Sequence, residues 1–402
     1  MFEIVDKEPN PTVIKVIGVG GAGGNAVEHM IREGVQGVEF ICVNTDAQAL
    51  RLSSAGLKIQ FGPGLGAGGK PEKARELALA ERDAIAEALE GAHMAFITAG
   101  MGGGTGTGAA PIVAEVAREL GILTVAVVTK PFEFEGKRLR LAEDGLAELA
   151  QNVDSLIVIL NEKLMEVLGD DVTMQEAFRS ADNVLKNAVG GIAEIINVPG
   201  LVNVDFEDVR TVMGEMGKAM MGSATAAGVD RARMAAEQAV ASPLLEGIEL
   251  SGARGVLVNV TASRQIGMRE VKEVMATIRN YASPEATIIF GTVFEEGMED
   301  QLRVTVVATG LGSPAVRGKK APPKPELVHV AAEGMGLRTG TDNQPMFMEQ
   351  AQQQGGAAGN GNMDFGGVFT SARGARNQAV AAMEASGVDK YDIPAFLRKQ
   401  AD

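Results

Sequence analysis

The sequence predicts an α/β protein built on a parallel sheet, with a long central helix and a second, smaller α/β domain. Three observations lead to this fold class. Short apolar runs such as 94–98, 123–128 and 155–160 alternate with helical patterns, as buried parallel strands do when helices cover both faces. Glycine-rich turns join two strands to helices, which is typical of Rossmann-like sheets. The longest helical pattern, residues 172–196, follows this sheet and precedes the second domain.

The composition indicates a folded protein that does not hold its partners by positive charge. The formal net charge is −15, which argues against electrostatic binding to nucleic acid or to an anionic membrane. No run approaches the ~20 apolar residues that span a bilayer, and the N-terminus has no signal pattern, so we expect a cytoplasmic protein without direct membrane insertion. The single Cys42 excludes an internal disulfide, and the three histidines have no metal-ligand spacing, so no metal-ligating residue is predicted.

The first predicted strand, residues 13–18, leads through a glycine-rich turn into a helix. Gly18, Gly20 and Gly23 match the dinucleotide fingerprint G-x-G-x-x-G. Alone, this motif indicates a nucleotide at the helix start without selecting which nucleotide. The residues that we expect to contact it are Gly20, Gly21, Ala22, Gly23, Gly24 and Asn25.

The second predicted strand, residues 38–44, closes with Asn44, Thr45 and Asp46. These polar groups suit a ribose or a phosphate, and Asn44 is a candidate contact. The alternative is that they cap a helix beginning at Ala47, and the sequence leaves both interpretations open.

A glycine-rich loop at residues 62–71 nearly matches the Walker phosphate loop. Pro71 stands where the magnesium-binding Ser or Thr should be, so we reject that match. We expect instead a mobile loop over a site, followed by one helix over residues 72–90.

The most informative stretch is the turn at residues 102–108, between the strand 94–98 and a helix over 109–120. Glycines let the backbone approach a ligand closely, and a helix start offers unpaired N–H groups with a positive dipole end. A flexible linker is disfavoured, because linkers do not normally join a buried strand to an amphipathic helix. The predicted phosphate cradle consists of Gly104, Thr105, Gly106, Thr107 and Gly108.

Charged residues follow the strand 123–128 at its carboxyl end, where ligands of doubly wound sheets collect. Glu135 can accept from ribose hydroxyls, and Arg138 or Arg140 can meet a phosphate or a base. The alternative is a solvated charge cluster that opens a helix.

Phe178 and Asp182 lie four residues apart near the start of the long helix, hence on one face. The ring can stack on a base while the carboxylate accepts from a ring N–H and an exocyclic amine, a donor pair that guanine offers. The alternative is a core Phe beside an exposed Asp. Thr173 and Glu176 form a capping box that starts this helix.

An acidic loop follows the long helix and includes Asn203, Asp205 and Asp208. These side chains suit a water or a cation, although Asp205 can instead cap a helix over 206–216. The helix places them roughly 27 Å beyond Phe178 at 1.5 Å per residue. They can reach the nucleotide of a neighbouring copy, and such a head-to-tail contact generates a filament.

The rest of the chain gives a contact domain and a tail. A helical stretch over 209–241, strands at 255–261, 286–294 and 302–309, and a helix over 268–282 form a second α/β domain. Pro-, Gly- and Gln-rich sequence then predicts a disordered linker, and the apolar face after Asp392 predicts a peptide that orders on a partner. The predicted boundaries are 1–171 nucleotide domain, 172–200 central helix, 201–312 second domain, 313–388 linker and 389–402 peptide.

These motifs resemble the FtsZ family, the bacterial tubulin-like GTPases of the cell-division ring. The turns at 102–108 and 20–25, the acidic loop and the tail carry the resemblance. It implies GTP or GDP on both glycine turns, Phe178 and Asp182 at guanine, and Asp205 and Asp208 completing the hydrolysis site of the adjoining subunit at mid-cell. It also implies that the tail from Asp392 to Arg398 binds the membrane tethers FtsA or ZipA and ring regulators.

The chain departs from the family pattern after Glu135. Leu139 occupies the position of the usual Arg, with Arg138 and Arg140 on either side, and the loop is one residue short. Which Arg meets the nucleotide stays open.

The hypothesis that these motifs and the resemblance favour is GTP hydrolysis between subunits, with Mg²⁺ neutralising the developing charge. One rival is a dinucleotide-dependent oxidoreductase, which leaves the second glycine turn and the acidic loop unexplained. The other is a structural protein that polymerises with nucleotide but barely hydrolyses it, and phosphate release distinguishes it.

Overall fold

The structure is a computed structural model of the chain, which divides into two units, residues 1–322 and 323–402. It describes residues 12–169, 172–198, 202, 204–215, 217–242, 245 and 252–311, all of them in the first unit. The predicted linker 313–388, the predicted peptide 389–402 and Asn203 therefore lie outside the described residues.

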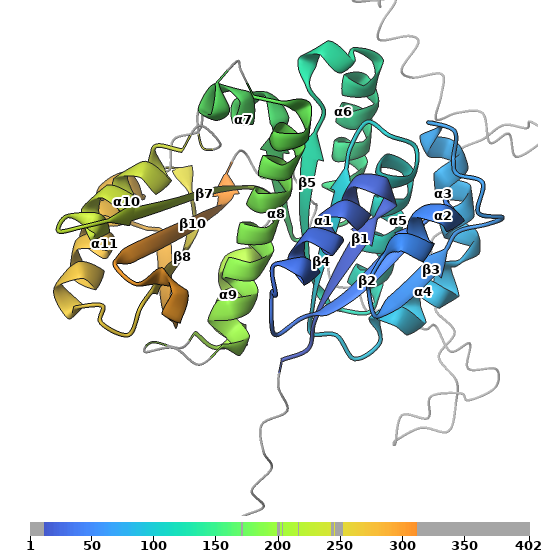
Figure 1. Cartoon of the computed structure of the whole chain (residues 1–402). Helices are drawn as coiled ribbons and strands as arrows, with labels where there is room; N and C mark the ends of the chain where they lie inside the picture. The colour runs from blue at the N-terminus through green and yellow to red at the C-terminus, as the bar shows by residue number, and fades with distance from the viewer. Residues whose placement is uncertain are drawn as a thin grey trace, which may run out of the picture. The chain divides into compact units, whose positions relative to one another are not determined.

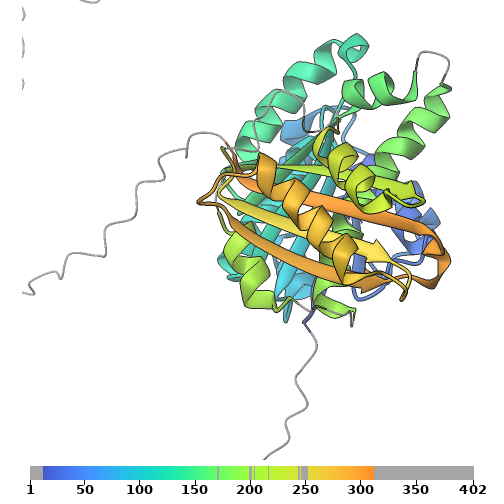
Figure 2. The same ribbon diagram turned by 90° about the vertical axis from the view of Figure 1, so that its left-hand side faces the viewer.

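The described strands form one sheet, in the order β3-β2-β1-β4-β5-β6-β7-β10-β8-β9 (Figures 1 and 2). Neighbours from β3 to β7 run parallel, β10 is antiparallel to β7 and β8, and β9 is parallel to β8. The strands are β1 (Ile14–Val19), β2 (Glu39–Asn44), β3 (Leu57–Gln60), β4 (Met94–Gly100), β5 (Leu123–Lys130), β6 (Ser155–Leu160), β7 (Gly217–Ala227), β8 (Gly255–Ala262), β9 (Thr287–Phe294) and β10 (Gln301–Leu311).

The α/β fold class predicted from the sequence is confirmed. Successive side chains of the central strands enter opposite cores, with Val16 and Phe96 in one and Ile17 and Ile97 in the other. This explains why the strands read as unbroken apolar runs. The helices are α1 (Gly20–Arg32), α2 (Ala47–Leu52), α3 (Pro71–Ala80), α4 (Arg82–Leu89), α5 (Thr105–Glu119), α6 (Lys137–Leu149), α7 (Asn161–Leu168), α8 (Met174–Asn197), α9 (Phe206–Met213), α10 (Arg231–Val240) and α11 (Met268–Tyr281).

The first six strands have the order 3-2-1-4-5-6, which is that of dinucleotide-binding sheets. From β1 the chain moves first to β2 on one side, and later returns to β4 on the other. The carboxyl ends of β1 and β4 therefore form the switch point where such sheets bind ligands. Helices α1 and α5 begin directly after these two strands or their turns.

Helix α8 is one continuous element that contacts both halves of the sheet, and in Figure 1 it runs from the level of α7 to that of α9. The predicted capping box starts it, because Thr173 Oγ1 accepts from Glu176 N and Thr173 N donates to Glu176 Oε2. Leu185, Val189 and Ile192 bury its apolar face in the core that also holds β8 to β10 residues such as Leu257.

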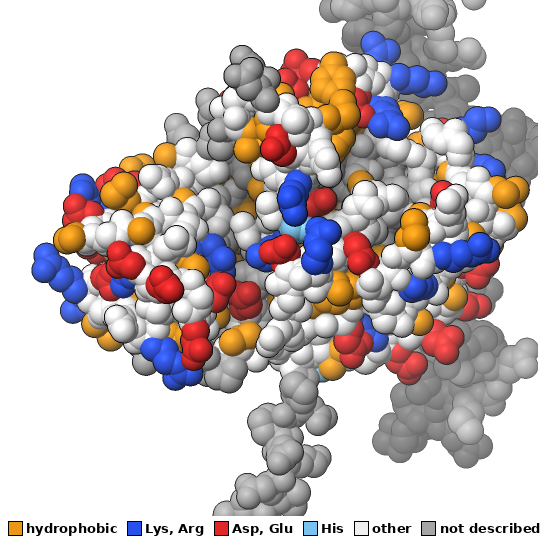
Figure 3. Space-filling model, viewed as in Figure 1, with side chains coloured by type: hydrophobic (Ala, Val, Ile, Leu, Met, Phe, Trp, Pro, Cys, Tyr) orange, Lys and Arg blue, Asp and Glu red, His pale blue; other side chains and the backbone are white. Residues whose placement is uncertain are grey.

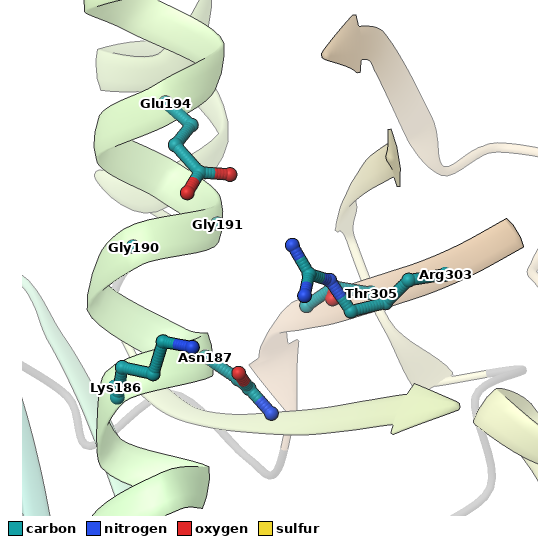
Figure 4. Close-up of a pocket in the computed structure, with 7 residues that line it drawn as sticks. All are labelled: Lys186, Asn187, Gly190, Gly191, Glu194, Arg303 and Thr305. Atoms are coloured by element: carbon teal, nitrogen blue, oxygen red, sulfur yellow. The ribbon is translucent and has the colours of Figure 1, made fainter. Parts of the chain in front are cut away.

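The contact between α8 and β10 also has a polar pocket, shown in Figure 4. Glu194 on α8 and Arg303 on β10 extend toward the space between these elements. Burial raises the pKa of Glu194, and the Arg303 guanidinium opposes that rise. The lining residues are Lys186, Asn187, Gly190, Gly191, Glu194, Arg303 and Thr305.

Three sequence predictions about elements were wrong. Residues 217–227, expected to be helical, form β7, which hydrogen-bonds to β6 and β10. The helix expected over 72–90 is broken at Glu81 into α3 and α4, and β3 was not predicted. Helix α9 ends at Met213, before the expected residue 216.

No helix in the described part of the chain is both long and apolar enough to cross a membrane. On the face shown in Figure 3, acidic and basic side chains are interspersed rather than gathered by sign.

Gly222→Ala should destabilise the chain because α10 packs directly on the backbone of β7. A Cβ at Gly222 would lie 1.9 Å from the Ala239 carbonyl oxygen, so the helix must move away. We expect a loss of about 3 kcal/mol, at the upper end for overpacking. Urea unfolding measures it, with Gly252→Ala as the control, since a Cβ there meets nothing within 4 Å. Equal stabilities of the two variants would contradict this packing.

Candidate nucleotide site

Two helix N-termini meet at the switch point of the sheet. Val19 at the end of β1 pairs with Ala99 near the end of β4. A Cβ at Gly20, which has a φ of +75°, would lie 2.9 Å from Gly106 N. No side chain caps the start of α1 or of α5. Two positive helix ends with unpaired N–H groups therefore face one place, which is the chemistry that binds phosphate groups.

Glycines around this point serve two purposes. At Gly23 a Cβ would lie 2.3 Å from the Thr98 carbonyl oxygen, so this glycine lets α1 pack closely on β4. At Gly21, Gly24 and Gly103 a Cβ would meet nothing within 4 Å. These three positions border open space beside the helix ends, and Ala22 and Asn25 are exposed there too. Gly21, Ala22, Gly24 and Asn25 thus border open space beside the helix ends, and their contact with a phosphate group stays a prediction.

The second turn divides the predicted contacts differently. Thr107 Oγ1 accepts from Gly102 N at 2.8 Å and is buried, and Gly108 N donates to Gly104 O at 3.0 Å. The Thr107 hydroxyl and the Gly108 N–H were expected to bind the ligand, but in the structure they form hydrogen bonds within the turn and stabilise its shape. Thr105 is half-buried, and its hydroxyl lies 2.7 Å from the Thr45 hydroxyl.

The loop at residues 62–70 lies beside this cradle, where the sequence placed it. Its backbone is tied to the end of β2, since Gly66 N donates to Thr45 O and Ala47 N donates to Gly64 O. A Cβ at Gly104 would lie 3.0 Å from Ala67 Cβ. The loop therefore covers the second turn.

The residues after β2 follow the capping alternative. Asp46 is the N-cap of α2 and accepts from Gln48 N and Ala49 N. Asn44 is buried, and its Oδ1 accepts from Asp46 N at 3.2 Å. The side chain of Asn44 thus supports the helix start, and its contact with nucleotide stays a prediction.

The segment after β5 forms a compact aromatic and charged corner. Phe132 stacks on Phe134 at 5.2 Å, and its ring meets the edge of Phe178 at 5.7 Å between centroids. Phe178 is 45% exposed, so it is not the core Phe of the alternative interpretation. Glu135 accepts from Phe132 N and from Arg138 Nη1.

Glu135 and Arg138 are thus paired with each other at the opening of α6, as the charge-cluster alternative expects. Arg140 is exposed on the same helix. Arg138 lies against the start of the second glycine turn, since a Cβ at Gly102 would be 2.7 Å from the Arg138 carbonyl oxygen and 3.1 Å from its Cβ. The guanidinium of Arg138 is bonded to Glu135, so its contact with nucleotide stays a prediction, as does that of Arg140.

Asp182 lies half-buried on α8, facing α1. Burial raises its pKa to about 6, while the Arg32 guanidinium on α1 works against the rise. Arg32 Nη2 can only donate, so His29 Nδ1 accepts at 2.9 Å, and His29 Nε2 then donates to Asn183 Oδ1 at 2.7 Å. Sequence reasoning missed these three neighbours, although the spacing of His29 and Arg32 places both on one face of the helix after the first glycine turn.

The predicted catalytic residues Asp205 and Asp208 lie near the amino end of β4, whereas the glycine turns lie at the carboxyl ends of β1 and β4. Asp205 caps α9, and its Oδ1 accepts from Asp208 N at 2.8 Å, so the capping alternative holds for Asp205. The ring of Phe206 meets His93, which directly precedes β4. Because β4 has seven residues, the acidic residues and the glycine turns are separated by a strand of about 20 Å.

Among the described residues, no group of three or more His, Cys, Asp or Glu side chains is arranged to hold a metal ion.

A doubly wound sheet with two uncapped helix starts at its switch point defines a nucleoside-phosphate-binding protein. Residues 13–169 match the model of the Tubulin/FtsZ family GTPase domain, and residues 217–312 match that of the FtsZ family C-terminal domain. The chain belongs to the Tubulin/FtsZ family and is a GTPase.

Curated relatives and solved structures agree with this assignment. The cell division protein FtsZ of Pseudomonas aeruginosa is 50% identical over 408 residues, covering 100% of both chains. That of Coxiella burnetii is 58% identical over 330 residues, covering 81% of this chain and 86% of the relative.

An empty FtsZ dimer from M. jannaschii has a TM-score of 0.72 at 42% identity, covering 76% of this chain and 89% of that one. A GTPγS-bound CetZ2 protofilament from Haloferax volcanii has a TM-score of 0.65 at 20% identity, covering 75% and 94%. The CetZ2 likeness concerns the fold alone.

Asp182→Asn should stabilise the folded chain near neutral pH and make no difference in acid. The pKa of Asp182 is about 6 in the folded protein and has its ordinary value of 3.8 in the unfolded chain, so the folded protein holds this proton more tightly. The ionised carboxyl therefore costs stability above about pH 6, and the cost disappears as the pH falls toward 4. We expect about 2 kcal/mol after allowing for solvent screening.

Urea unfolding of both proteins across this pH range measures the effect, with the exposed Asp144→Asn as the control. A constant difference between the Asp182 variant and the parent at every pH would contradict the assigned titration.

Proposed function

We propose that this chain is a cell-division GTPase that assembles head to tail and hydrolyses GTP between subunits. The main support for this proposal is that the phosphate cradle and the acidic residues lie at opposite ends of the central strands, the cradle at the carboxyl ends and the acidic residues near the amino end of β4. A group on α9 cannot reach a nucleotide on α1 and α5 of the same chain across a strand of about 20 Å. A second copy stacked on the first brings the two ends together.

In this proposal the glycine turns hold the phosphates. The N–H groups at the starts of α1 and α5 bind phosphate oxygens, and residues 62–70 limit the cradle from the side. Phe178 stacks on the base, and the ionised Asp182 accepts from the donor pair of guanine. Glu135 with Arg138 or Arg140 borders the ribose side, and Asn44 supports the turn after β2.

Hydrolysis then needs a water placed in line with the γ-phosphate. The neighbour's Asp205 and Asp208 orient or activate this water, and Asn203 lies in the same loop. Mg²⁺ bound to the phosphates would supply charge neutralisation. Because the acidic residues come from the adjoining subunit, assembly completes the site, and loss of the γ-phosphate weakens the contact that made it.

The family relationship supports this function over its rivals. Relatives named as cell division proteins align along the whole chain, including the tail. We therefore propose a place at the mid-cell ring in the cytoplasm and a tail, Asp392 to Arg398, that binds tethers such as FtsA and ZipA. The GTPase domain match displaces the oxidoreductase alternative. A protein that polymerises but barely hydrolyses remains distinguishable by phosphate release.

Phosphate release from GTP with Mg²⁺, measured across protein concentrations, tests the shared site. Activity per molecule should rise steeply above a threshold concentration, because the site exists only in assembled subunits. Sedimentation of the same samples should show assembly at that threshold. Constant activity per molecule down to high dilution would mean that one chain holds the complete site.

Asp208→Ala should keep GTP binding and lose about a hundredfold or more in turnover, the usual weight of a positioned acid or base. Asp208 is the better target because the Asp205 carboxylate also caps α9, so its loss would disturb the helix as well. Turnover and the binding of a fluorescent GTP analogue are measured together. The matched control is Glu207→Ala, an exposed carboxylate in the same turn. An equal loss in both variants would indicate a general charge effect instead of a placed carboxylate.

A further inference from the structure

We propose that His93 is a positioning residue for the acidic loop: its ring holds Phe206, and Phe206 fixes the carboxylates of Asp205 and Asp208. This inference rests on the proposed role of that loop in hydrolysis. It assigns a task to a side chain outside the loop and outside the nucleotide cradle.

His93 is itself held firmly in place at the amino end of β4. Its backbone N–H donates to Val13 O at 2.9 Å, and its carbonyl oxygen accepts from Leu123 N at 3.1 Å. Its Nδ1 accepts from Val13 N at 3.1 Å, which fixes the orientation of the imidazole. The main chain of His93 is therefore bonded to Val13, directly before β1, and to Leu123 at the start of β5, and its ring is bonded to Val13 as well.

The contact with Phe206 reaches the centre of the acidic turn. The ring centroids are 6.0 Å apart at an interplanar angle of 72°, an edge-to-face arrangement of the favourable kind. Phe206 directly follows Asp205, the N-cap of α9, and lies two residues before Asp208. Holding this ring holds the backbone of the turn from which both carboxylates project, and Asp205 Oδ1 also accepts from Asp208 N within that turn.

Other contacts hold the chain on either side of the turn, and Val204, which precedes Asp205, is buried in the main core. Arg210 Nη2 donates to Gly121 O at 3.5 Å, and Thr309 Oγ1 donates to Val212 O at 2.7 Å, so both act further along α9. Before the turn, Val202 N donates to Thr292 Oγ1 at 3.0 Å. Within the described residues at the turn, His93 is the side chain from the nucleotide half whose ring meets Phe206.

Positioning matters here because the carboxylates must meet a nucleotide carried by another molecule. A misplacement of 1 Å can cost two orders of magnitude in rate. Both carboxylates are exposed, so packing on the carboxylates themselves does not fix them. The ring of Phe206, half-buried against the main core, is the part of the turn through which a neighbour can hold it.

Three substitutions of His93 separate the possible roles of the side chain. His93→Ala removes the ring and the acceptor. His93→Asn keeps an acceptor near the position of Nδ1 but has no ring, and His93→Phe keeps a ring against Phe206 but has no acceptor. Glu90→Gln, in the preceding exposed turn, is the control.

Each variant is assayed as the full chain for GTP-analogue binding, thermal unfolding, and phosphate release against protein concentration. In the last plot, the threshold reports assembly and the slope above it reports turnover per assembled subunit. We expect the slope to fall about tenfold for His93→Ala and His93→Asn. The slope should stay near that of the parent for His93→Phe and Glu90→Gln, with GTP binding unchanged throughout.

The outcomes distinguish this inference from the proposed function. Full turnover in Asp208→Ala would remove the function and this role together. Loss of turnover in Asp208→Ala with an unchanged slope in His93→Ala would overturn the positioning role alone. A shifted threshold concentration at an unchanged slope would show that His93 serves the subunit contact instead. A slope near that of the parent in His93→Asn but not in His93→Phe would assign the effect to the hydrogen bond with Val13 and would overturn the role of the ring.

A double-mutant cycle with Phe206→Leu tests the route. If His93 acts through Phe206, the slope in the double variant should be no lower than in the worse single variant. Multiplying losses would show that the two side chains act independently and would overturn the proposed path.

Discussion

The meeting of Gly20 with Gly106 is the contact on which the arrangement of the site depends. It brings together two helices that begin on neighbouring parallel strands, β1 and β4, so their positive ends face the same place. A side chain at Gly20 would push the helices apart. A Cβ at Gly106 would lie 2.5 Å from the Gly100 carbonyl oxygen, so the second turn has no room on the side that faces β4. The cradle is thus a property of the backbone, and the strand order creates it.

The sequence predicted this part well because its signals are local. An apolar run, a glycine turn and an amphipathic helix are readable without tertiary information, and both turns were placed at strand ends from that pattern. The division of labour within the second turn was not readable. Thr105 and Thr107 look alike in sequence, but only the packing of the turn buries Thr107 and directs its hydroxyl to Gly102 N. The sequence predicts that a hydroxyl lies beside the glycines, but only the folded structure determines which group that hydroxyl binds.

Strand β7 failed for a related reason. Its Ala and Met residues favour a helix, but β6 and β10 offer hydrogen bonds on both sides, and Gly222 lets α10 lie on it. Tertiary pairing overrides propensity here.

His93 was assigned no role from the sequence, because the three histidines have no metal-ligand spacing. Its contact with Phe206 joins positions that are 113 residues apart and appears only once β4 and α9 are packed.

The acidic turn around Asp205 and Asp208 is also positioned by long-range packing. Its residues follow α8, which contacts both halves of the sheet, and its neighbours come from both halves as well. Gly121 and His93 belong to the nucleotide half, whereas Thr292 and Thr309 belong to strands β9 and β10. A turn held from two halves of one continuous sheet responds to any relative movement of those halves. The position of the two carboxylates therefore depends on packing from both halves of the sheet as well as on the local sequence of the turn.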